Sequence, residues 1–309
     1  MPTQSLDLQG HRGARGLMPE NTLPGFSKAL AIGVNTLELD CVITRDDVVV
    51  VCHDRQLNPD LARRNLEWVV APGPVIRSLS YEELCEYEVG RIKPDTAYAE
   101  RFPAQAPLDR VKIPRLSEVF ALVKSLGADD VRFSIETKLH PLRPEQSPAP
   151  QAFAEMLLKE IDAAGMIDRT SVQSFDWRTL SVMQQLAPQI PTVYLSAQQS
   201  GEDTIGTASK TGSPWTNRIR YAEHGSVPRM VQAAGGKIWS PHQADLNAEN
   251  IAEAHALGLG VVVWTVNDAA GIENMIDLGV DGIISDYPNR LRKVAESKGL
   301  PLPRVYGAA

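Results

Sequence analysis

Short runs of apolar and β-branched residues alternate with stretches of helical periodicity along almost the whole chain. The runs predict strands at residues 6–9, 36–44, 131–138, 171–174, 192–195, 237–240, 261–266 and 282–285, with 48–52 hairpinned onto the second strand. The helical patterns lie between them, at residues 24–31, 116–126, 149–164, 177–186, 227–234, 248–257, 269–278 and 291–297. Strands that alternate with helices favour a parallel sheet covered by helices. Eight such units predict a single (β/α)8 TIM barrel over residues 1–309, with a doubly wound open sheet as the alternative.

Two polar segments interrupt this alternation. Residues 55–112 are rich in proline and arginine, and they contain a short helical pattern at 81–87. They are predicted to form an insertion on the loop after the second strand. Residues 197–225 form a second excursion, rich in glycine, serine and threonine. Long segments of this kind in a compact domain are often lids or binding loops.

Composition excludes several classes of protein. The formal net charge is −7 and no block of lysine and arginine stands out, so we expect no nucleic-acid partner. No apolar run is long enough to cross a membrane, and no leader precedes the first strand. These features predict a cytoplasmic protein, or a periplasmic one if a leader has been removed. The three cysteines indicate neither a disulfide framework nor a zinc site, and the oligomeric state stays open.

Carboxylates gather where two predicted strands end. Glu38 and Asp40 stand two residues apart, and Glu136 and Lys138 repeat that spacing on the next strand. Residues i and i+2 of a strand share one face, so these side chains project to the same side. Clustered carboxylates need a compensating cation, and oxygen ligands favour Mg²⁺ or Ca²⁺. The alternative is an ion-pair network of these four residues that only stabilises the barrel.

Histidines follow two other predicted strands. His11 and Arg12 come directly after the first strand, and His53 ends the run "VVVVCHD". Two histidines beside an acidic cluster can move protons in both directions near neutral pH. Arg12 offers a planar fork for a phosphate, and the glycines around it let backbone amides approach. This set of residues suits cleavage of a phosphodiester, since no P-loop or kinase signature accompanies it.

Several motifs, taken together, resemble the glycerophosphodiester phosphodiesterases. They are "HRGARGLMPENTLPGF", "LELDCVITRDDVVVVCHD", "IETK", "IPRLSEVF", "QSFDW", "VVVWTVND" and "GVDGIISDYP", and they span nearly the whole chain in order. The resemblance implies a (β/α)8 barrel with an insertion after the second strand. It also implies His11 and His53 as the acid/base pair, Arg12 and Lys138 as phosphate contacts, and Glu38, Asp40 and Glu136 as ligands of Ca²⁺ or Mg²⁺.

The same resemblance implies a reaction. A glycerophosphodiester, a small molecule, would be hydrolysed to sn-glycerol 3-phosphate and an alcohol, after the neighbouring glycerol hydroxyl has attacked phosphorus to give a cyclic phosphate. Two alternatives remain open. One is a lysophospholipase D-like activity, which would call for an apolar patch around the rather polar residues 55–112. The other is a non-catalytic barrel that binds a ligand without turning it over. The presence of both histidines and all three carboxylates argues against that alternative.

The remaining polar and aromatic residues near the motifs have simpler explanations. Asn21 could line the site, but Asn21 or Thr22 would serve equally well as the cap of the helix that follows, and the cap is the preferred interpretation of Asn21. Asp286 could support the site or cap the last helix, and the cap is again preferred. Glu20 could line the site. Trp264, at the end of the seventh strand, could form a wall for the glycerol moiety or belong to the core, and Phe175 has the same two interpretations. Four histidines have no acidic neighbours in the sequence and are expected to be structural: His140, His224, His242 and His255.

Overall fold

A computed structural model describes residues 6–307, and its main sheet closes on itself. The eight parallel strands are β1 (Asp7–Gly10), β2 (Thr36–Ile43), β7 (Arg132–Thr137), β8 (Thr170–Ser174), β9 (Thr192–Ser196), β10 (Ile238–Pro241), β11 (Gly260–Val263) and β12 (Gly282–Ser285). Because β1 pairs with both β12 and β2, no edge remains between them. The predicted TIM barrel is confirmed, and the open sheet is excluded. Strand β3 (Val49–Val51) pairs antiparallel with β2, as the hairpin prediction required.

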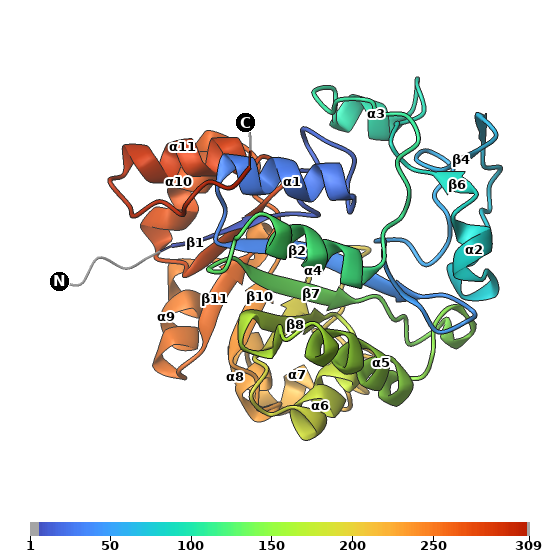
Figure 1. Cartoon of the computed structure of the whole chain (residues 1–309). Helices are drawn as coiled ribbons and strands as arrows, with labels where there is room; N and C mark the ends of the chain where they lie inside the picture. The colour runs from blue at the N-terminus through green and yellow to red at the C-terminus, as the bar shows by residue number, and fades with distance from the viewer. Residues whose placement is uncertain (1–5, 308–309) are drawn as a thin grey trace.

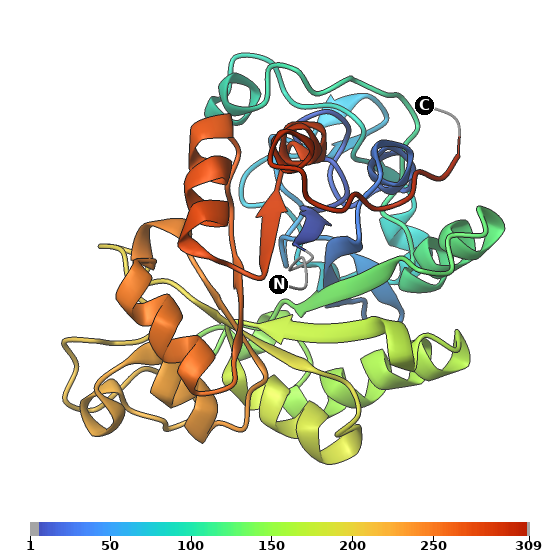
Figure 2. The same ribbon diagram turned by 90° about the vertical axis from the view of Figure 1, so that its left-hand side faces the viewer.

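Helices surround the barrel (Figures 1 and 2). The eight that follow the barrel strands are α1 (Leu23–Ile32), α4 (Leu116–Ser125), α5 (Pro150–Ala163), α6 (Trp177–Leu186), α8 (Val227–Ala233), α9 (Ala248–Ala256), α10 (Ala269–Leu278) and α11 (Pro288–Ser297). Most boundaries lie within one residue of the predicted ones. The exceptions are α11, which begins three residues early because proline suits the first turn of a helix, and strand β11, which ends at Val263 and not at residue 266. Between residues 6 and 307, every helix is too short or too polar to cross a bilayer.

Strand β2 explains how a fully buried strand can carry charge. All eight of its residues are buried, yet their side chains alternate between two environments. Leu37, Leu39 and Cys41 belong to the hydrophobic core under the helices. Glu38 and Asp40 alternate with them, so they project into the barrel. The period-2 pattern of this strand therefore fixes which residues can reach the site.

Residues 55–112 build a small structure beside the barrel, on the right of Figure 1. It contains β4 (Arg63–Arg64), β5 (Glu67–Trp68), β6 (Tyr87–Glu88), a 3-10 turn (Ile76–Ser78), α2 (Tyr81–Leu84) and α3 (Ala97–Arg101). A separate apolar cluster, which includes Ile76, Leu84 and Tyr87, packs against Val42 and Val50 of the barrel hairpin. The helix predicted at 81–87 is too long. It ends at Leu84, because Tyr87 pairs with Arg64 in the small sheet.

The second excursion, residues 197–225, has one helical turn, α7 (Tyr221–His224), within the described chain. Its conformation depends on side chain to backbone hydrogen bonds. The Asp203 carboxylate accepts from the backbone N–H groups of Ile205, Gly206 and Thr207. Farther along, the carbonyl of Trp215 accepts from the N–H of Trp177 at the start of α6 (2.9 Å). The segment is therefore shaped by its own hydrogen bonds around Asp203 and is tied to helix α6 at Trp215.

Candidate active site

A cavity of about 870 Å³ opens at the carboxyl ends of the barrel strands. In a TIM barrel this is the end at which the βα loops place reactive groups. Each of the eight strands contributes a lining residue. Seven of these lie within one residue of the strand's end, namely His11, Glu136, Gln173, Leu195, His242, Trp264 and Ile284, and the eighth, Glu38, is the third residue of the longer strand β2. His53, which follows β3, lines the same space. Of the residues selected from the sequence, His11, Arg12, Glu38, His53, Glu136 and Trp264 thus meet around one cavity, whereas Asp40 and Lys138 do not line it.

The turn between β1 and α1 has an unusual backbone. Arg12 has a φ of 49° and Gly13 has a φ of 83°. A Cβ on Gly13 would lie 2.7 Å from the carbonyl carbon of Gly25, so only glycine fits there. The left-handed Arg12 is held by both its backbone groups: its N–H donates to Glu38 Oε2 (2.9 Å), and its carbonyl accepts from the N–H of Asn21 (3.0 Å). The glycine-rich stretch therefore serves to place His11 and Arg12.

Three buried carboxylates form an acidic cluster. Glu38, Asp40 and Glu136 each offer an oxygen within 4.8 Å of the others. Asp40 and Glu136 are register partners on the neighbouring strands β2 and β7. Glu38 precedes Asp40 by two residues and so lies on the same face. The convergence expected from the i, i+2 spacing is present.

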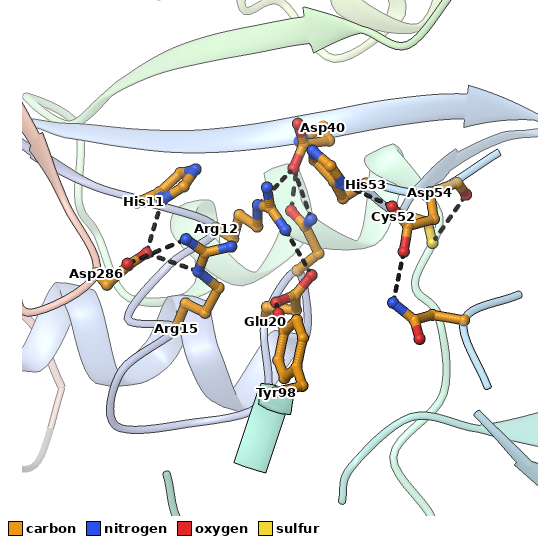
Figure 3. A network of polar contacts seen from close by, with 12 residues as sticks. His11, Arg12, Arg15, Glu20, Asp40, Cys52, His53, Asp54, Tyr98 and Asp286 are labelled. Carbon is orange, nitrogen blue, oxygen red and sulfur yellow. Dashed lines mark hydrogen bonds and ion pairs between the residues drawn. The ribbon is translucent and has the colours of Figure 1, made fainter. Parts of the chain in front are cut away.

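Two cationic side chains contact this cluster. Arg12 Nε lies 3.3 Å from Asp40 Oδ2, and Lys138 Nζ donates to Glu136 Oε1 (2.8 Å) and lies 3.7 Å from Asp40 Oδ1. Both were predicted to contact phosphate, and in this structure both contact carboxylates. Arg12 also donates to Glu20 Oε1 (2.8 Å), whose other oxygen accepts from the hydroxyl of Tyr98 (Figure 3). Glu20, left open by the sequence, thus joins the site to helix α3 of the insertion.

The charge of the cluster is only partly balanced by these cations. Burial raises the pKa of Glu38 well above its usual range and that of Glu136 to about 7, whereas the Arg12 guanidinium lowers the pKa of Asp40. Gln173 donates from Nε2 to Glu38 Oε1 (2.7 Å), while its own Oε1 is buried with no hydrogen-bond partner among residues 6–307. Three carboxylates beside an unpaired amide oxygen provide the hard oxygen donors that a divalent cation requires, so these residues fit such an ion.

His11 is held by a buried carboxylate. Its Nδ1 lies 2.6 Å from Asp286 Oδ1, and Arg15 donates to both oxygens of Asp286, from Nε (2.7 Å) and Nη2 (3.0 Å) (Figure 3). Burial, assisted by Arg15, lowers the pKa of His11 to about 4. A neutral ring that donates from Nδ1 to an ionised carboxylate has a free lone pair on Nε2, and this atom lies 3.8 Å from Glu38 Oε2.

His53 has a similar arrangement. Its Nδ1 lies 2.7 Å from Asp54 Oδ1, and Asn58 donates to Asp54 Oδ2 (2.8 Å). Desolvation and the nearby Arg12 lower the pKa of His53. The contact with His53 holds the pKa of Asp54 below its usual range. Both histidines are therefore oriented by carboxylates, one on each side of the acidic cluster.

Two predictions about helix caps are wrong. Asn21 does not cap α1: its side chain donates to Asp40 Oδ2 (2.8 Å), and Thr22 accepts from the N–H of Gly25 instead. Asp286 does not cap α11, whose N-cap residue is Tyr287 and which has no side-chain cap. Both side chains are turned inward because a buried charged group offers a stronger hydrogen bond than a helix amide that water can reach.

Sequence reasoning missed the residues that support the reactive groups. These are the buried Asn21, Gln173 and Asp286, each bonded to a predicted catalytic or ligand residue, and the buried Arg15, which is bonded to Asp286. Their position in the sequence could have indicated two of them, since Gln173 and Asp286 also lie at the ends of predicted strands. Trp264 and Phe175 line the cavity with His140 and His242, whereas the exposed His255 pairs with Asp281 (2.9 Å).

Known proteins share this sequence and fold. A model of the Glycerophosphoryl diester phosphodiesterase family matches residues 11–290. A "Glycerophosphodiester phosphodiesterase" from Bacillus altitudinis is 26% identical over 93% of this chain and 96% of its own. The human protein named "Lysophospholipase D GDPD1" is 25% identical over 91% of this chain and 83% of its own. The crystal structure of a Silicibacter pomeroyi DSS-3 protein, which has the name of a glycerophosphoryl diester phosphodiesterase, superimposes on this chain with a TM-score of 0.85 and 35% sequence identity. The match covers 97% of this chain and 96% of that protein.

Proposed function

The chain belongs to the glycerophosphoryl diester phosphodiesterase family, and we propose that it hydrolyses glycerophosphodiesters to sn-glycerol 3-phosphate and an alcohol with a divalent metal ion. One observation carries the proposal. Two histidines, each oriented by a carboxylate, line one cavity beside a cluster of three carboxylates that fits a cation. Proton transfer and neutralisation of phosphoryl charge are the two requirements of this hydrolysis.

Glu38, Asp40 and Glu136 would hold the ion, with Mg²⁺ and Ca²⁺ as the candidates. When bound, the ion supplies charge that stabilises the phosphoryl oxygens. Arg12 and Lys138 already lie beside this cluster. A cation among the carboxylates would take over part of the charge balance that these side chains now provide. Their N–H groups could then donate to phosphate oxygens.

His11 and His53 would share the proton transfers. One accepts the proton of the glycerol 2-hydroxyl as its oxygen bonds to phosphorus, and the other donates a proton to the departing alcohol oxygen. Water then opens the cyclic phosphate with the two roles reversed, so each histidine regains its first protonation state. The free Nε2 of His11 and the carboxylate on its Nδ1 suit a group that must accept a proton and then stabilise it. Trp264 would pack against the organic part of the substrate.

Release of sn-glycerol 3-phosphate from glycerophosphocholine, with and without a chelator, tests this function. We expect turnover that a chelator abolishes and that added Ca²⁺ or Mg²⁺ restores. The product is detected by a coupled dehydrogenase assay. Turnover that survives the chelator would contradict the role of the metal, and no turnover with either ion would contradict the enzyme assignment.

A lysophospholipase D activity is the second candidate. A human relative has that name, and Leu142, which lines the cavity, has 66% of its surface exposed. An exposed leucine at the mouth offers a contact for an acyl chain. Parallel assays with glycerophosphocholine and lysophosphatidylcholine separate the candidates, since the second activity requires faster turnover of the acylated substrate.

A further inference from the structure

An aromatic wall forms the side of the cavity opposite the β1–α1 turn. It consists of His140, Trp215, Phe175, Trp264 and His242 in that spatial order, and neighbouring ring centroids are 4.7, 6.5, 5.4 and 5.0 Å apart. Neighbouring planes are inclined by 61°, 75°, 90° and 79°, so the wall is folded into corners. All five rings line the cavity. A small group in such a corner can contact more than one ring.

The two tryptophans of the wall are fixed in place. Trp264 donates from Nε1 to the carbonyl of Ser240 (3.0 Å), which fixes the plane of its indole. Trp215 belongs to the excursion 197–225 and is tied to helix α6 through its carbonyl. Both are partly exposed to the cavity. The excursion therefore contributes a preorganised surface, which reduces the entropy cost of binding.

The histidines of the wall are compatible with a cation. The Nδ1 atoms of His140 and His242 accept from the backbone N–H groups of Leu142 and Ala244, each at 3.1 Å. A ring nitrogen that accepts a backbone N–H has no proton of its own, so these rings are neutral in this arrangement. They would not repel a positively charged ligand.

Charge divides the cavity into two halves. The lining cations among the described residues are Arg12, Arg15 and Arg101, which come from the first third of the chain. The lining from residues 140–268 contains the carboxylates Glu202, Asp203 and Asp268, with no lysine or arginine in this described part. The aromatic wall therefore lies on the side of the cavity whose described lining has carboxylates and no cation, whereas the other side combines the three arginines with Glu38 and Glu136.

We propose that the aromatic wall binds the quaternary ammonium of a choline head group at the corner of Phe175 and Trp215, which makes choline phosphodiesters the preferred substrates. This inference rests on the proposed function. A trimethylammonium group is weakly hydrated, and aromatic faces attract it through their quadrupoles. The three carboxylates add attraction at longer range. A neutral alcohol such as glycerol receives neither contribution.

Kinetics with matched substrates test the preference. The neutral partner of glycerophosphocholine is its 3,3-dimethylbutyl analogue, in which carbon replaces the nitrogen at the same shape. We expect kcat/KM to be about 10-fold higher for the choline ester, a ratio that Trp215→Leu and Phe175→Leu both reduce to near one. The control is Trp68→Leu, a partly buried tryptophan on β5 outside this cavity, which should keep the full ratio. Lysophosphatidylcholine, as a third substrate, shows whether the enzyme turns over the acylated or the unacylated choline ester faster.

Binding of free choline to the metal-loaded protein gives a readout without turnover. Calorimetry should detect choline and not 3,3-dimethylbutanol, and Trp215→Leu should weaken choline binding about 10-fold. Choline binding without hydrolysis of any diester would contradict the proposed function and the substrate preference, and it would support only the choline site on the aromatic wall. Equal hydrolysis of the charged and neutral esters without choline binding would overturn this inference and leave the proposed function intact.

Discussion

His11 and His53 stand out among the side chains of the site because a carboxylate fixes one ring nitrogen of each. His11→Ala should lower kcat by about 100- to 10,000-fold, the usual contribution of a positioned acid or base. Stability should fall by less than about 2 kcal/mol, because Asp286 keeps its contacts with Arg15 and Asn267. Single-turnover rates and urea denaturation measure both quantities.

His224→Ala is the matched control for that variant. His224 lies on the single turn α7 and does not line the cavity, so its loss should leave kcat within a factor of two of the parent value, about 0.4 kcal/mol. A folded His11→Ala protein with near-parental turnover would remove His11 from the reaction.

Asp286 is a positioning residue, because it reaches the reaction only through His11. Asp286→Asn should lower kcat about 100-fold or more, since an amide does not stabilise the imidazolium that forms during turnover. Arg15→Lys keeps a cation beside Asp286 and should retain most of the activity. Comparable losses of activity in the two variants would mean that Asp286 acts only through general stability.

The same substitution should change how stability depends on pH. His11 and Arg15 hold the folded-state pKa of Asp286 below its unfolded value of about 4. The ionised carboxylate therefore stabilises the fold at pH values above 4, and this contribution is lost as the pH falls through the folded-state pKa. Unfolding free energies of the parent and Asp286→Asn should differ by about 3 kcal/mol at pH 7 and converge below pH 4. A constant difference from pH 3 to pH 7 would contradict this linkage.

The turn between β1 and α1 determines where the first histidine and arginine lie. Gly13→Ala should lower the unfolding free energy by more than 2 kcal/mol, because the new Cβ meets the backbone of Gly25 in addition to the strain of a positive φ. Gly127→Ala is the control, since that glycine has a φ of 63° with open space around it, and about 1 kcal/mol should be lost there. Equal losses at the two glycines would show that the contact with Gly25 is unimportant.

Periodicity predicted the elements well because local and tertiary preferences agree in this barrel. The alternation in β2 identified Glu38 and Asp40 as inward residues, and the run 48–52 correctly indicated a hairpin. The insertion was less predictable, because Tyr87 pairs with a residue 23 positions earlier, and such pairing leaves no local signal. Asn21 and Asp286 were assigned to caps for the same reason: their partners lie 19 and 275 residues away.

Closure of the barrel brings like charges together, and this has a consequence for the whole molecule. The fold holds Glu38, Asp40 and Glu136 from two strands in one buried cluster, and burial together with the neighbouring Asp40 carboxylate opposes the ionisation of Glu38. A divalent ion that binds only the folded chain should stabilise it by about 2.7 kcal/mol at 100 times its dissociation constant. We therefore expect Ca²⁺ or Mg²⁺ to raise the melting temperature by several degrees, and a chelator to reverse the shift.

Glu38→Gln separates binding of the ion from general stability. The amide keeps an oxygen for the N–H of Arg12 while it removes one of the three negative charges, so the metal-free protein should be at least as stable as the parent. The shift in melting temperature on addition of metal should fall to near zero, because a ligand of the ion has lost its charge. Calorimetric titration of both proteins with each ion measures the affinity directly. If the variant binds the ion as tightly as the parent, Glu38 does not ligate it, and the repulsion in the cluster must be relieved by Arg12 and Lys138 alone.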